Sequence, residues 1–186
     1  MKFRDLTADE IEIRVQSIKQ KGGEPAGVIL LLYKNARCDM NILDETVGAE
    51  NWQREHYECK GNLFCRVGIY CDNEGTTKLA CWVWKSDCGT ESNTEKEKGE
   101  SSDSFKRACT NWGIGRELYT SPFIWIPAEQ CNIYDTKRKD QYGNPIFATN
   151  DRFCVEKIII EEKKITAISI INENKKARCF VWQKQN

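Results

Sequence analysis

The amino-acid sequence predicts an α+β fold, in which an antiparallel three-stranded meander precedes a long helix and a C-terminal β extension follows. Three observations support this class. Residues 63–71 alternate between apolar and polar side chains, which is the period of a half-buried strand. Residues 105–112 carry apolar side chains at the spacing of one helix face. Residues 152–185 contain short runs rich in isoleucine and valine, separated by charged turns.

The N-terminal segment predicts a helix. Thr7 and Glu10 have the spacing of a capping box, and two glycines end the segment. Between these signals, apolar residues recur at the spacing of one helical face: Ile11, Val15 and Ile18. Residues 28–33 then predict a short apolar strand, and residues 36–48 predict a second helix with Gly48 at its C-terminal end.

The meander is predicted over three segments, residues 52–59, 63–71 and 78–89. Short turns rich in glycine, asparagine and aspartate join them, so neighbouring strands are expected to pair antiparallel. The long helix follows, and Thr94 and Glu97 again have capping-box spacing. Its apolar stripe ends at Trp112, and Gly113 and Gly115 are expected to terminate it.

The chain changes character after residue 127. Residues 128–150 are polar and predict a loop, whereas residues 152–185 predict three short strands joined by the turns EEKK and NENKKA. The expected organisation is therefore a core over residues 1–126, which includes the N-terminal helix, and a β-rich extension over residues 127–186 that packs on the core.

Charge and hydropathy narrow the classes of function. The 186 residues include 28 basic and 28 acidic side chains, so the net charge is zero. A nucleic-acid surface must then be a local stripe of cations. No apolar run approaches the roughly 18 residues of a membrane span. The N-terminus becomes polar within a few residues, which predicts a cytoplasmic protein without a signal peptide.

Ten cysteines and a single histidine predict neither a metal site nor another cofactor. The sequence contains no CxxC pair, and structural zinc sites require closely spaced soft ligands. Without a secretory signal, the thiols are expected to be reduced and to behave as small apolar side chains. The lone His56 lies on a predicted strand, where a structural role is expected, so no catalytic residue is assigned.

A cluster of acidic side chains offers one enzymatic alternative. Five carboxylates surround the start of the long helix: Glu91, Glu95, Glu97, Glu100 and Asp103. Such a group could hold magnesium in a metal-dependent nuclease. Acidic residues are also favoured at the positive, N-terminal end of a helix dipole, and this preference explains the same cluster without a catalytic or metal-binding role.

The end of the long helix raises a second possibility. The glycines of GIGREL follow the helix instead of opening it, so the segment does not predict a phosphate loop. Lys98, Lys106 and Arg107 lie on the exposed side of this helix, and Arg37, ahead of the second helix, could approach the same surface. This stripe is either an ordinary solvated face or a track for phosphates, with bases lying flat against an aromatic-rich sheet.

Three separated segments of the sequence resemble the Rad-fifty-two family of single-strand DNA annealing proteins, in particular its short phage and bacterial members. They are LLYKNARCDMNILDETVGAENWQ, the three-strand meander and SDSFKRACTNWGIGRELY, all within residues 28–126. The D-x-x-K-R-A start, the W-G-I-G-R continuation and the L-D-E-x-x-G-x-x-N-W helix exit occur in the order and spacing of the family.

The resemblance implies a β-β-β-α core, with the meander packed on the long helix, whose protomers assemble side by side into a ring. Single-stranded DNA would lie in an outer basic groove with its bases facing outward, and no nucleotide would be hydrolysed. Asn111 stands where eukaryotic members carry a basic side chain, and Arg116 belongs to the bacterial form of the motif. The implied DNA-binding residues are Arg37, Lys98, Lys106, Arg107, Asn111 and Arg116.

Together these observations favour a non-enzymatic protein that binds and anneals single-stranded DNA in homologous recombination and DNA repair. Annealing requires strands held by their backbones while the base edges remain free. Residues 127–186 lie outside the resemblance, and in larger family members the tail recruits a recombinase or a single-strand binding protein. Two alternatives remain: a protein-interaction module on the same fold that has lost DNA binding, and the metal-dependent nuclease.

Overall fold

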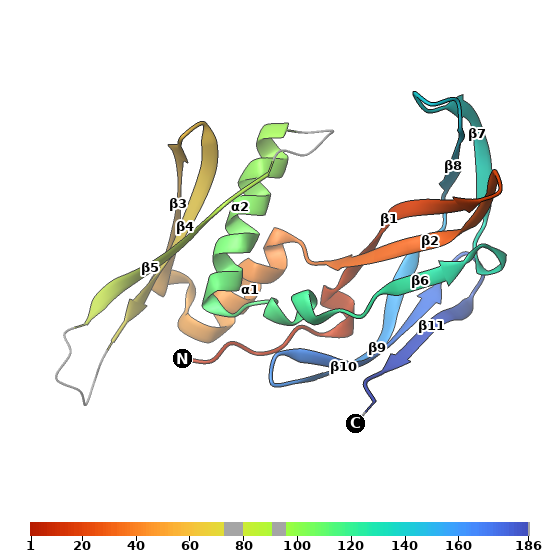
Figure 1. Ribbon diagram of the computed structural model, residues 1–186. Coiled ribbons are helices and arrows are strands. Elements are labelled where there is room, and N and C mark those ends of the chain that lie inside the picture. Colours follow the sequence, from red (N-terminus) through yellow and green to blue (C-terminus); the bar gives the residue numbers. More distant parts are fainter. Residues whose placement is uncertain (73–79, 91–95, 186) are drawn as a thin grey trace. The chain divides into compact units, whose positions relative to one another are not determined.

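The computed structural model describes residues 1–72, 80–90 and 96–185, with only the backbone described for residues 96–98. The fold divides into two compact units (Figure 1), each built from two separate stretches of sequence. The first unit contains Met1–Asp5 and Asn35–Arg116, and the second contains Leu6–Lys34 and Glu117–Asn186. No helix in these described stretches is both long enough and apolar enough to cross a membrane.

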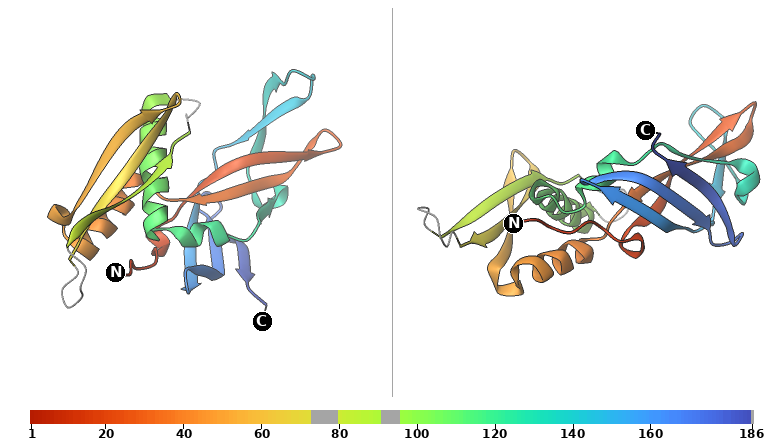
Figure 2. Two further views of the ribbon diagram at one scale, coloured as in Figure 1. Left: turned by 60° about the vertical axis from the view of Figure 1, so that its left-hand side comes forward. Right: turned by 90° about the horizontal axis from the view of Figure 1, so that it is seen from below.

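The first unit contains a three-stranded antiparallel sheet in the order β3-β4-β5 and two α-helices. Figures 1 and 2 show α2 running along one face of this sheet. In chain order, the elements are α1 (Ala36–Val47), the 3₁₀-helix η2 (Ala49–Asn51), β3 (Trp52–Cys59), β4 (Asn62–Cys71), β5 (Cys81–Cys88) and α2 (Lys96–Trp112). The two α-helices and the three strands form where the sequence predicts them, whereas η2 is not predicted, and Thr94 of the expected cap lies outside the described residues.

The core of the first unit lies between α2 and the sheet. Strand alternation turns three side chains of β4 toward the helix, and the helix presents three side chains at helical spacing. All six are fully buried: Cys65, Val67, Ile69, Phe105, Ala108 and Cys109. Their removal from water is the main source of stability for this contact, at about 25 cal/mol per Å² of apolar surface.

Helix α2 ends at Gly113, as the sequence predicts. The Gly113 N–H donates to the Thr110 carbonyl at 3.0 Å, and the Ile114 N–H donates to the Cys109 carbonyl at 3.2 Å. These two bonds define a Schellman motif, which requires a left-handed residue directly after the helix. Gly113 has φ of 101°, a value that glycine adopts without steric cost. The glycines of GIGREL therefore terminate a helix.

The second unit is almost entirely β. Its main sheet has six antiparallel strands in the order β11-β10-β9-β1-β2-β6, and β7 and β8 form a separate hairpin. The two edge strands β11 and β6 approach each other, so the sheet curls into a nearly closed barrel (Figure 2). The elements are η1 (Ala8–Glu10), β1 (Glu12–Lys21), β2 (Glu24–Tyr33), η3 (Arg116–Thr120), β6 (Ile124–Pro127), η4 (Ala128–Gln130), β7 (Ile133–Lys139), β8 (Pro145–Thr149), β9 (Phe153–Glu161), β10 (Lys164–Asn172) and β11 (Ala177–Gln183).

The predicted fold class is wrong. The chain is not an α+β protein built on a β-β-β-α core: in the described part of the chain 51% of the residues are strand and 24% are helix, and the largest element there is a six-stranded antiparallel sheet. That sheet takes β1 and β2 from the N-terminal part and β9, β10 and β11 from the three C-terminal strands that the sequence predicts. The division into a core over residues 1–126 and an extension over residues 127–186 stays a prediction.

The N-terminal helix prediction is also wrong, because residues 12–21 form strand β1. The capping contact is present, since the Thr7 N–H donates to Glu10 Oε2 at 2.9 Å, but it closes only the short η1. The stretch IEIRVQ that follows alternates apolar and polar residues and is rich in β-branched side chains, which favour a strand. Gly22 and Gly23 have φ of 63° and 84° and form a two-residue hairpin turn into β2.

Residues 128–150 are not a continuous loop, because β7 and β8 pair within them. Asp140 orders the turn by accepting the N–H groups of Tyr142 at 2.8 Å and Asn144 at 2.9 Å. A two-stranded ribbon leaves much of both faces exposed to solvent, so its sequence is polar and carries no clear alternation. This explains why the sequence suggests a loop.

A buried carboxylate holds three segments of the second unit together. Glu117 is fully buried, its Oε1 accepts the Leu6 N–H at 2.7 Å, and its Oε2 lies 3.8 Å from Lys163 Nζ. The Thr120 hydroxyl donates to the Glu117 carbonyl at 2.7 Å and accepts the Ile165 N–H at 2.8 Å. The Leu6 N–H and the Lys163 ammonium partly offset the cost of burying the carboxylate, whose Oε2 accepts no hydrogen bond from the described residues.

Replacement of Glu117 by alanine should therefore destabilise the protein. We expect Glu117→Ala to lower the free energy of unfolding by about 2 kcal/mol, because the buried Leu6 N–H loses its acceptor. Urea denaturation followed by tryptophan fluorescence measures this change. The exposed Glu129 supplies the matched control, and Glu129→Ala should change stability by less than about 0.5 kcal/mol. Equal stabilities for the two variants would contradict the assigned role.

Candidate nucleic-acid interface

The three-stranded sheet has one open face. Helix α2 covers the face that carries the buried side chains of β4, and the alternating residues point to the other side. On that side Tyr57 stands opposite Phe64, Tyr70 opposite Trp82, and Gly68 opposite Trp84. The five aromatic side chains on this face form what we call the aromatic row: Tyr57, Phe64, Tyr70, Trp82 and Trp84.

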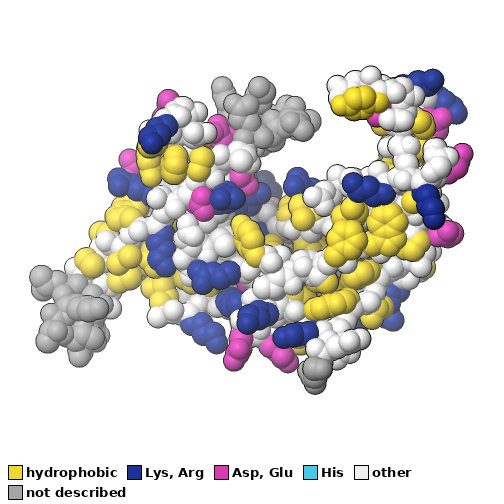
Figure 3. Space-filling view, viewed as in Figure 1, with side chains coloured by type: hydrophobic (Ala, Val, Ile, Leu, Met, Phe, Trp, Pro, Cys, Tyr) yellow, Lys and Arg dark blue, Asp and Glu magenta, His cyan; other side chains and the backbone are white. Residues whose placement is uncertain are grey.

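The rings of the aromatic row contact one another in favourable geometries. The centroids of Tyr57 and Phe64 are 5.6 Å apart and stacked. Tyr70 and Trp82 meet edge to face at 5.7 Å, and Trp82 and Trp84 lie 6.2 Å apart. These separations fall in the range of attractive aromatic pairs. Figure 3 shows hydrophobic side chains interspersed with Lys and Arg over β3, β4 and β5.

Arg66 lies within the aromatic row. It follows Phe64 by two residues on β4, and its guanidinium lies 4.6 Å from the centre of the Trp84 ring. Glu55, directly opposite on β3, accepts hydrogen bonds from Arg66 Nη2 at 2.6 Å and Nε at 2.9 Å. A Cβ at Gly68 would lie 2.8 Å from the Trp84 ring, so the missing side chain lets the indole lie flat on the sheet. The open face therefore presents two groups of rings, Tyr57 with Phe64 and Tyr70 with Trp82 and Trp84, and Arg66 lies over the second group.

Much of this surface is accessible. Tyr57, Tyr70 and Trp82 are 37%, 40% and 38% exposed, which is high for large aromatic side chains. Large exposed apolar patches on proteins often belong to interaction sites, which makes this face the candidate interface. Ring faces and an arginine can stack on the bases of single-stranded nucleic acid.

Two of the sequence-predicted DNA-binding residues join α2 to β5. Arg107 donates from Nε and Nη2 to Asp87 Oδ1, both at 3.2 Å. Asn111 donates from Nδ2 to the Ser86 carbonyl at 3.0 Å and to Asp87 Oδ2 at 3.4 Å. Both side chains thus have a structural role on the side of β5 that faces the helix.

Arg116 stabilises the C-terminus of α2. Its Nη2 donates to the carbonyls of Thr110 at 3.1 Å and Asn111 at 3.2 Å. Lys85 of β5 donates to the same Asn111 carbonyl at 2.9 Å, and its ammonium lies 4.4 Å from the centre of the Trp112 ring. Two cations therefore satisfy the last helix carbonyls and interact favourably with the negative end of the helix dipole.

The other predicted DNA-binding residues, Lys106, Arg37 and Lys98, take no part in the contacts described above. Lys106 is half-buried and directly precedes Arg107, whereas Arg37 is exposed in the first turn of α1. No hydrogen bond or ion pair among the described residues joins Arg37 to the α2 group. Lys98 falls within α2, but its side chain lies outside the described residues. The structure thus brings together Arg107, Asn111 and Arg116, and adds Lys85 to them.

The sequence predicts an aromatic-rich sheet beside the cations, but it does not identify Lys85, Arg66 or the individual rings of the aromatic row as members of the candidate site. The signal was present, because the period-two alternation of β4 and β5 divides their residues between two faces. Which face stays open depends on where α2 packs, and that is a tertiary property. Helical spacing alone cannot identify a cation that a neighbouring strand contributes.

The acidic cluster and the histidine have structural partners where they are described. Glu100 accepts the Leu63 N–H at 3.0 Å, and Asp103 accepts the Thr90 N–H at 3.1 Å. His56 Nε2 lies 3.1 Å from the Ser101 carbonyl. Glu91 and Glu95, and the side chain of Glu97, lie outside the described residues. Within the described part of the chain, no group of three or more acidic, histidine or cysteine side chains is arranged to hold a metal ion.

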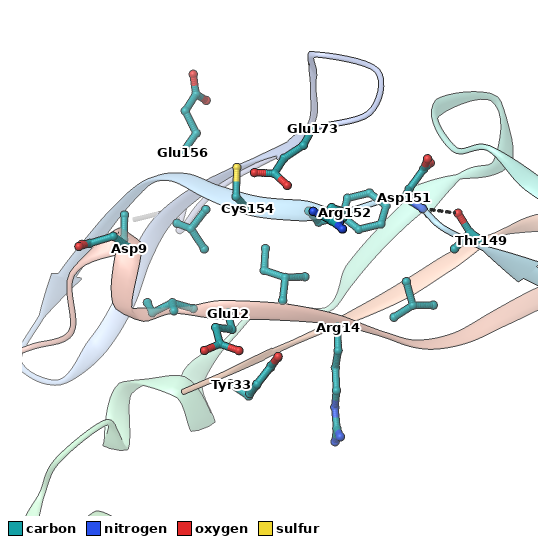
Figure 4. Close-up of a pocket in the computed structure, with 16 residues that line it drawn as sticks. Asp9, Glu12, Arg14, Tyr33, Thr149, Asp151, Arg152, Cys154, Glu156 and Glu173 are labelled. Atoms are coloured by element: carbon teal, nitrogen blue, oxygen red, sulfur yellow. Dashed lines mark hydrogen bonds between the residues drawn. The ribbon is translucent and has the colours of Figure 1, made fainter. Parts of the chain in front are cut away.

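The second unit contains a cleft of about 920 Å³ between β1 and the segment that enters β9 (Figure 4). Its carboxylates are largely engaged: Asp151 accepts the Asn132 N–H at 2.7 Å, and Glu156 accepts Arg178 Nε at 2.6 Å. Burial, together with the charge of Glu173, raises the pKa of the Cys154 thiol.

Tyr33 and Glu12 lie side by side in this cleft, with their oxygen atoms facing each other (Figure 4). A hydrogen bond to Glu12, burial, and the negative charge of Glu12 raise the pKa of Tyr33 to about 12. The phenol therefore stays protonated at neutral pH and donates to the carboxylate.

Comparison of the chain with protein-family models, curated proteins and solved structures found no match in any of the three. The resemblance to the Rad-fifty-two family stays a prediction that rests on the three sequence segments.

The Glu12–Tyr33 contact predicts a shift in tyrosine ionisation. One tyrosine should ionise near pH 12, and Glu12→Gln should return that transition toward the ordinary value of about 10, because the hydrogen bond to the carboxylate and its negative charge are both removed. Since the folded pKa exceeds the unfolded value, the contact contributes its full stability below about pH 10 and loses it as the pH rises through 12.

Tyrosinate absorbance measured against pH tests this assignment. Tyr33→Phe should remove the highest transition, and the exposed Glu24 supplies the control substitution, Glu24→Gln. A titration unchanged by Glu12→Gln would show that Glu12 does not control Tyr33.

Proposed function

We propose that the protein binds single-stranded DNA and anneals complementary strands without enzymatic activity. The observation that carries the proposal is the aromatic row, with Arg66 within it, on the open face of the three-stranded sheet. Stacking platforms of this composition on a sheet suit unpaired bases, whose faces are exposed only in single strands.

Stacking accounts for two requirements of annealing. Every base has a flat face, so stacking contributes about 1–3 kcal/mol per base whatever the sequence. A base that stacks on a ring keeps its Watson–Crick edge available, so a second strand can still pair with it. The aromatic row therefore supports sequence-independent binding that leaves the bases readable.

The cations beside β5 support contact with the DNA backbone. Lys85 and Arg107 lie on the helix side of β5, whereas Trp82 and Trp84 lie on the open side of the same strand. Because β5 is an edge strand of its sheet, a DNA chain stacked on the row can pass this edge with its phosphates near the cations. Arg37, Lys98, Lys106 and Arg116 belong to the same proposal as cations that add to the local potential, and Asn111 belongs to it as a polar side chain beside them.

The wider role follows from the sequence resemblance. We propose action in the cytoplasm in homologous recombination and DNA repair, with several copies of the chain arranged as a ring. Multivalent binding along one DNA strand would make weak individual contacts additive. Recruitment of a recombinase or a single-strand binding protein is part of this proposal.

A protein-interaction module is the second candidate, and the exposed aromatic surface on a chain of zero net charge favours it. Binding to an oligonucleotide across salt concentrations separates the two, because negligible binding even at low salt supports the interaction module. The nuclease has less support, since Glu100 and Asp103 already accept backbone N–H groups.

Loss of a ring from the aromatic row should weaken DNA binding. We expect Trp82→Ala to reduce the affinity for a labelled oligothymidine about tenfold, because stacking on one base is lost. Trp82→Tyr retains an aromatic face and should bind within about threefold of the parent. Fluorescence anisotropy at fixed salt measures all three proteins.

An exposed aromatic side chain outside the row provides the control. Phe123 is 70% exposed in the second unit, so Phe123→Ala should leave the affinity unchanged. If Trp82→Ala and Phe123→Ala bind equally well, the aromatic row does not hold the bases.

Loss of cations should change the salt dependence of binding. We expect the double variant Lys106→Ala, Arg107→Ala to bind more weakly and to reduce the slope of log K against log salt by about 1–2. Lys157→Ala removes an exposed cation of β9 and should preserve the slope. Circular dichroism of the double variant tests whether the fold survives loss of the Asp87 contact, and an unchanged slope in a folded variant would exclude these cations from the interface.

A further inference from the structure

Two cysteines face each other at one end of the β4–β5 hairpin. Cys71 is the last residue of β4 and stands directly opposite Cys81, the first residue of β5. Both thiols are free, Cys71 is half-buried, and Cys81 is exposed. In the described strands, no other two cysteines stand opposite each other. This pairing is therefore unusual among the ten cysteines of the chain.

The register suits a disulfide. Directly opposite residues of antiparallel strands have Cα atoms about 4.5–5.5 Å apart, and disulfides span Cα separations of about 4.4–6.8 Å. Opposite side chains also project from the same face of the sheet. Cys71 and Cys81 form the last pair of the β4–β5 ladder. The backbone at this end can therefore shift slightly to reach disulfide geometry without disturbing another pair of these two strands.

Accessibility distinguishes this pair from the buried cysteines. Burial raises the pKa values of Cys65, Cys131 and Cys179 to about 11, so these thiols stay protonated at neutral pH. The thiolate is the reactive form of cysteine, and it must also be reached by the oxidant. Exposed Cys81 meets the second requirement, and Cys71 stands beside it as a resolving thiol.

We propose that Cys71 and Cys81 are a redox modification site that a low-molecular-weight disulfide, such as glutathione disulfide, converts to a protein disulfide. The thiolate of Cys81 attacks one sulfur of glutathione disulfide, which forms a mixed disulfide and releases one glutathione thiolate. The thiolate of Cys71 then attacks Cys81 Sγ and releases the second glutathione thiolate. Two cysteine thiols are oxidised, one glutathione disulfide is reduced to two glutathiones, and the two cysteine protons pass to these through solvent.

The bond would act on the aromatic row. Cys71 and Cys81 adjoin Tyr70 and Trp82 in sequence, and the rings of those two residues meet at 5.7 Å. A covalent link between the strand ends limits the motion of both rings, and rigid binding surfaces lose less entropy when a ligand binds. Oxidation should therefore tighten DNA binding. This consequence rests on the function proposed above, but the formation of the disulfide is independent of that function.

Bond formation is tested on the full chain without DNA. The protein is equilibrated in glutathione buffers of increasing oxidised fraction, free thiols are alkylated, and tryptic peptides are analysed by mass spectrometry. We expect residues 67–78 joined to residues 79–85, and no such product from Cys71→Ser or Cys81→Ser. Cys59→Ser removes an exposed thiol that faces Asn62 and should leave the product intact. Alkylation of Cys71 and Cys81 in every buffer, or linkage of Cys81 to another cysteine, overturns the proposal.

Regulation is tested by oligothymidine binding to the oxidised and reduced protein. We expect severalfold tighter binding after oxidation and no redox response in the double variant Cys71→Ser, Cys81→Ser. If both redox forms of the parent bind equally, the regulatory part is wrong while DNA binding stands. If neither form binds although the linked peptides are found, the proposed function fails and the redox site stands.

Discussion

The packing of α2 on one face of the three-stranded sheet determines which side chains of the first unit reach solvent. Burial of Cys65, Val67 and Ile69 beneath the helix commits the alternating residues Phe64 and Arg66 to the other face. A shift of the strand by one residue would exchange the two sets. The contact that stabilises this unit therefore also specifies its exposed aromatic surface, and neither can change without the other.

The cations near α2 stabilise the fold, and they are also the groups proposed to bind DNA. Arg116 and Lys85 satisfy helix carbonyls, and Arg107 is held by Asp87, so these charges are positioned before any ligand arrives. Pre-positioned charges attract a polyanion at a low entropic cost, but a direct contact must compete with an existing bond. If Arg107 binds a phosphate as proposed, its hydrogen bonds to Asp87 Oδ1 must first be exchanged.

Sequence patterns predicted the parts of the fold whose signals are local. The Gly113 stop of α2 and the strands β3, β4 and β5 follow from turn chemistry and alternation over a few residues. The stretch IEIRVQSI fits both the helical period and the strand period. Its pairing with β2 and β9, which lie elsewhere in the sequence, selects the strand. The site shows the same limit, because helical spacing groups Arg107 with Asn111 but cannot reveal Asp87, their shared partner on β5.

The interleaving of the two units along the chain has a consequence for biosynthesis. The first unit is complete once residue 116 has left the ribosome, whereas β1 and β2, made earlier, meet β6 and β9 only after residues 124 and 153. Until β6 is made both edges of the nascent β1–β2 hairpin lack their native neighbours, and the β1 edge still lacks its neighbour until β9 is made; unpaired edges promote aggregation. A chain that terminates between residues 116 and 153 would therefore contain a complete first unit and a β1–β2 hairpin with at least one unpaired, aggregation-prone edge.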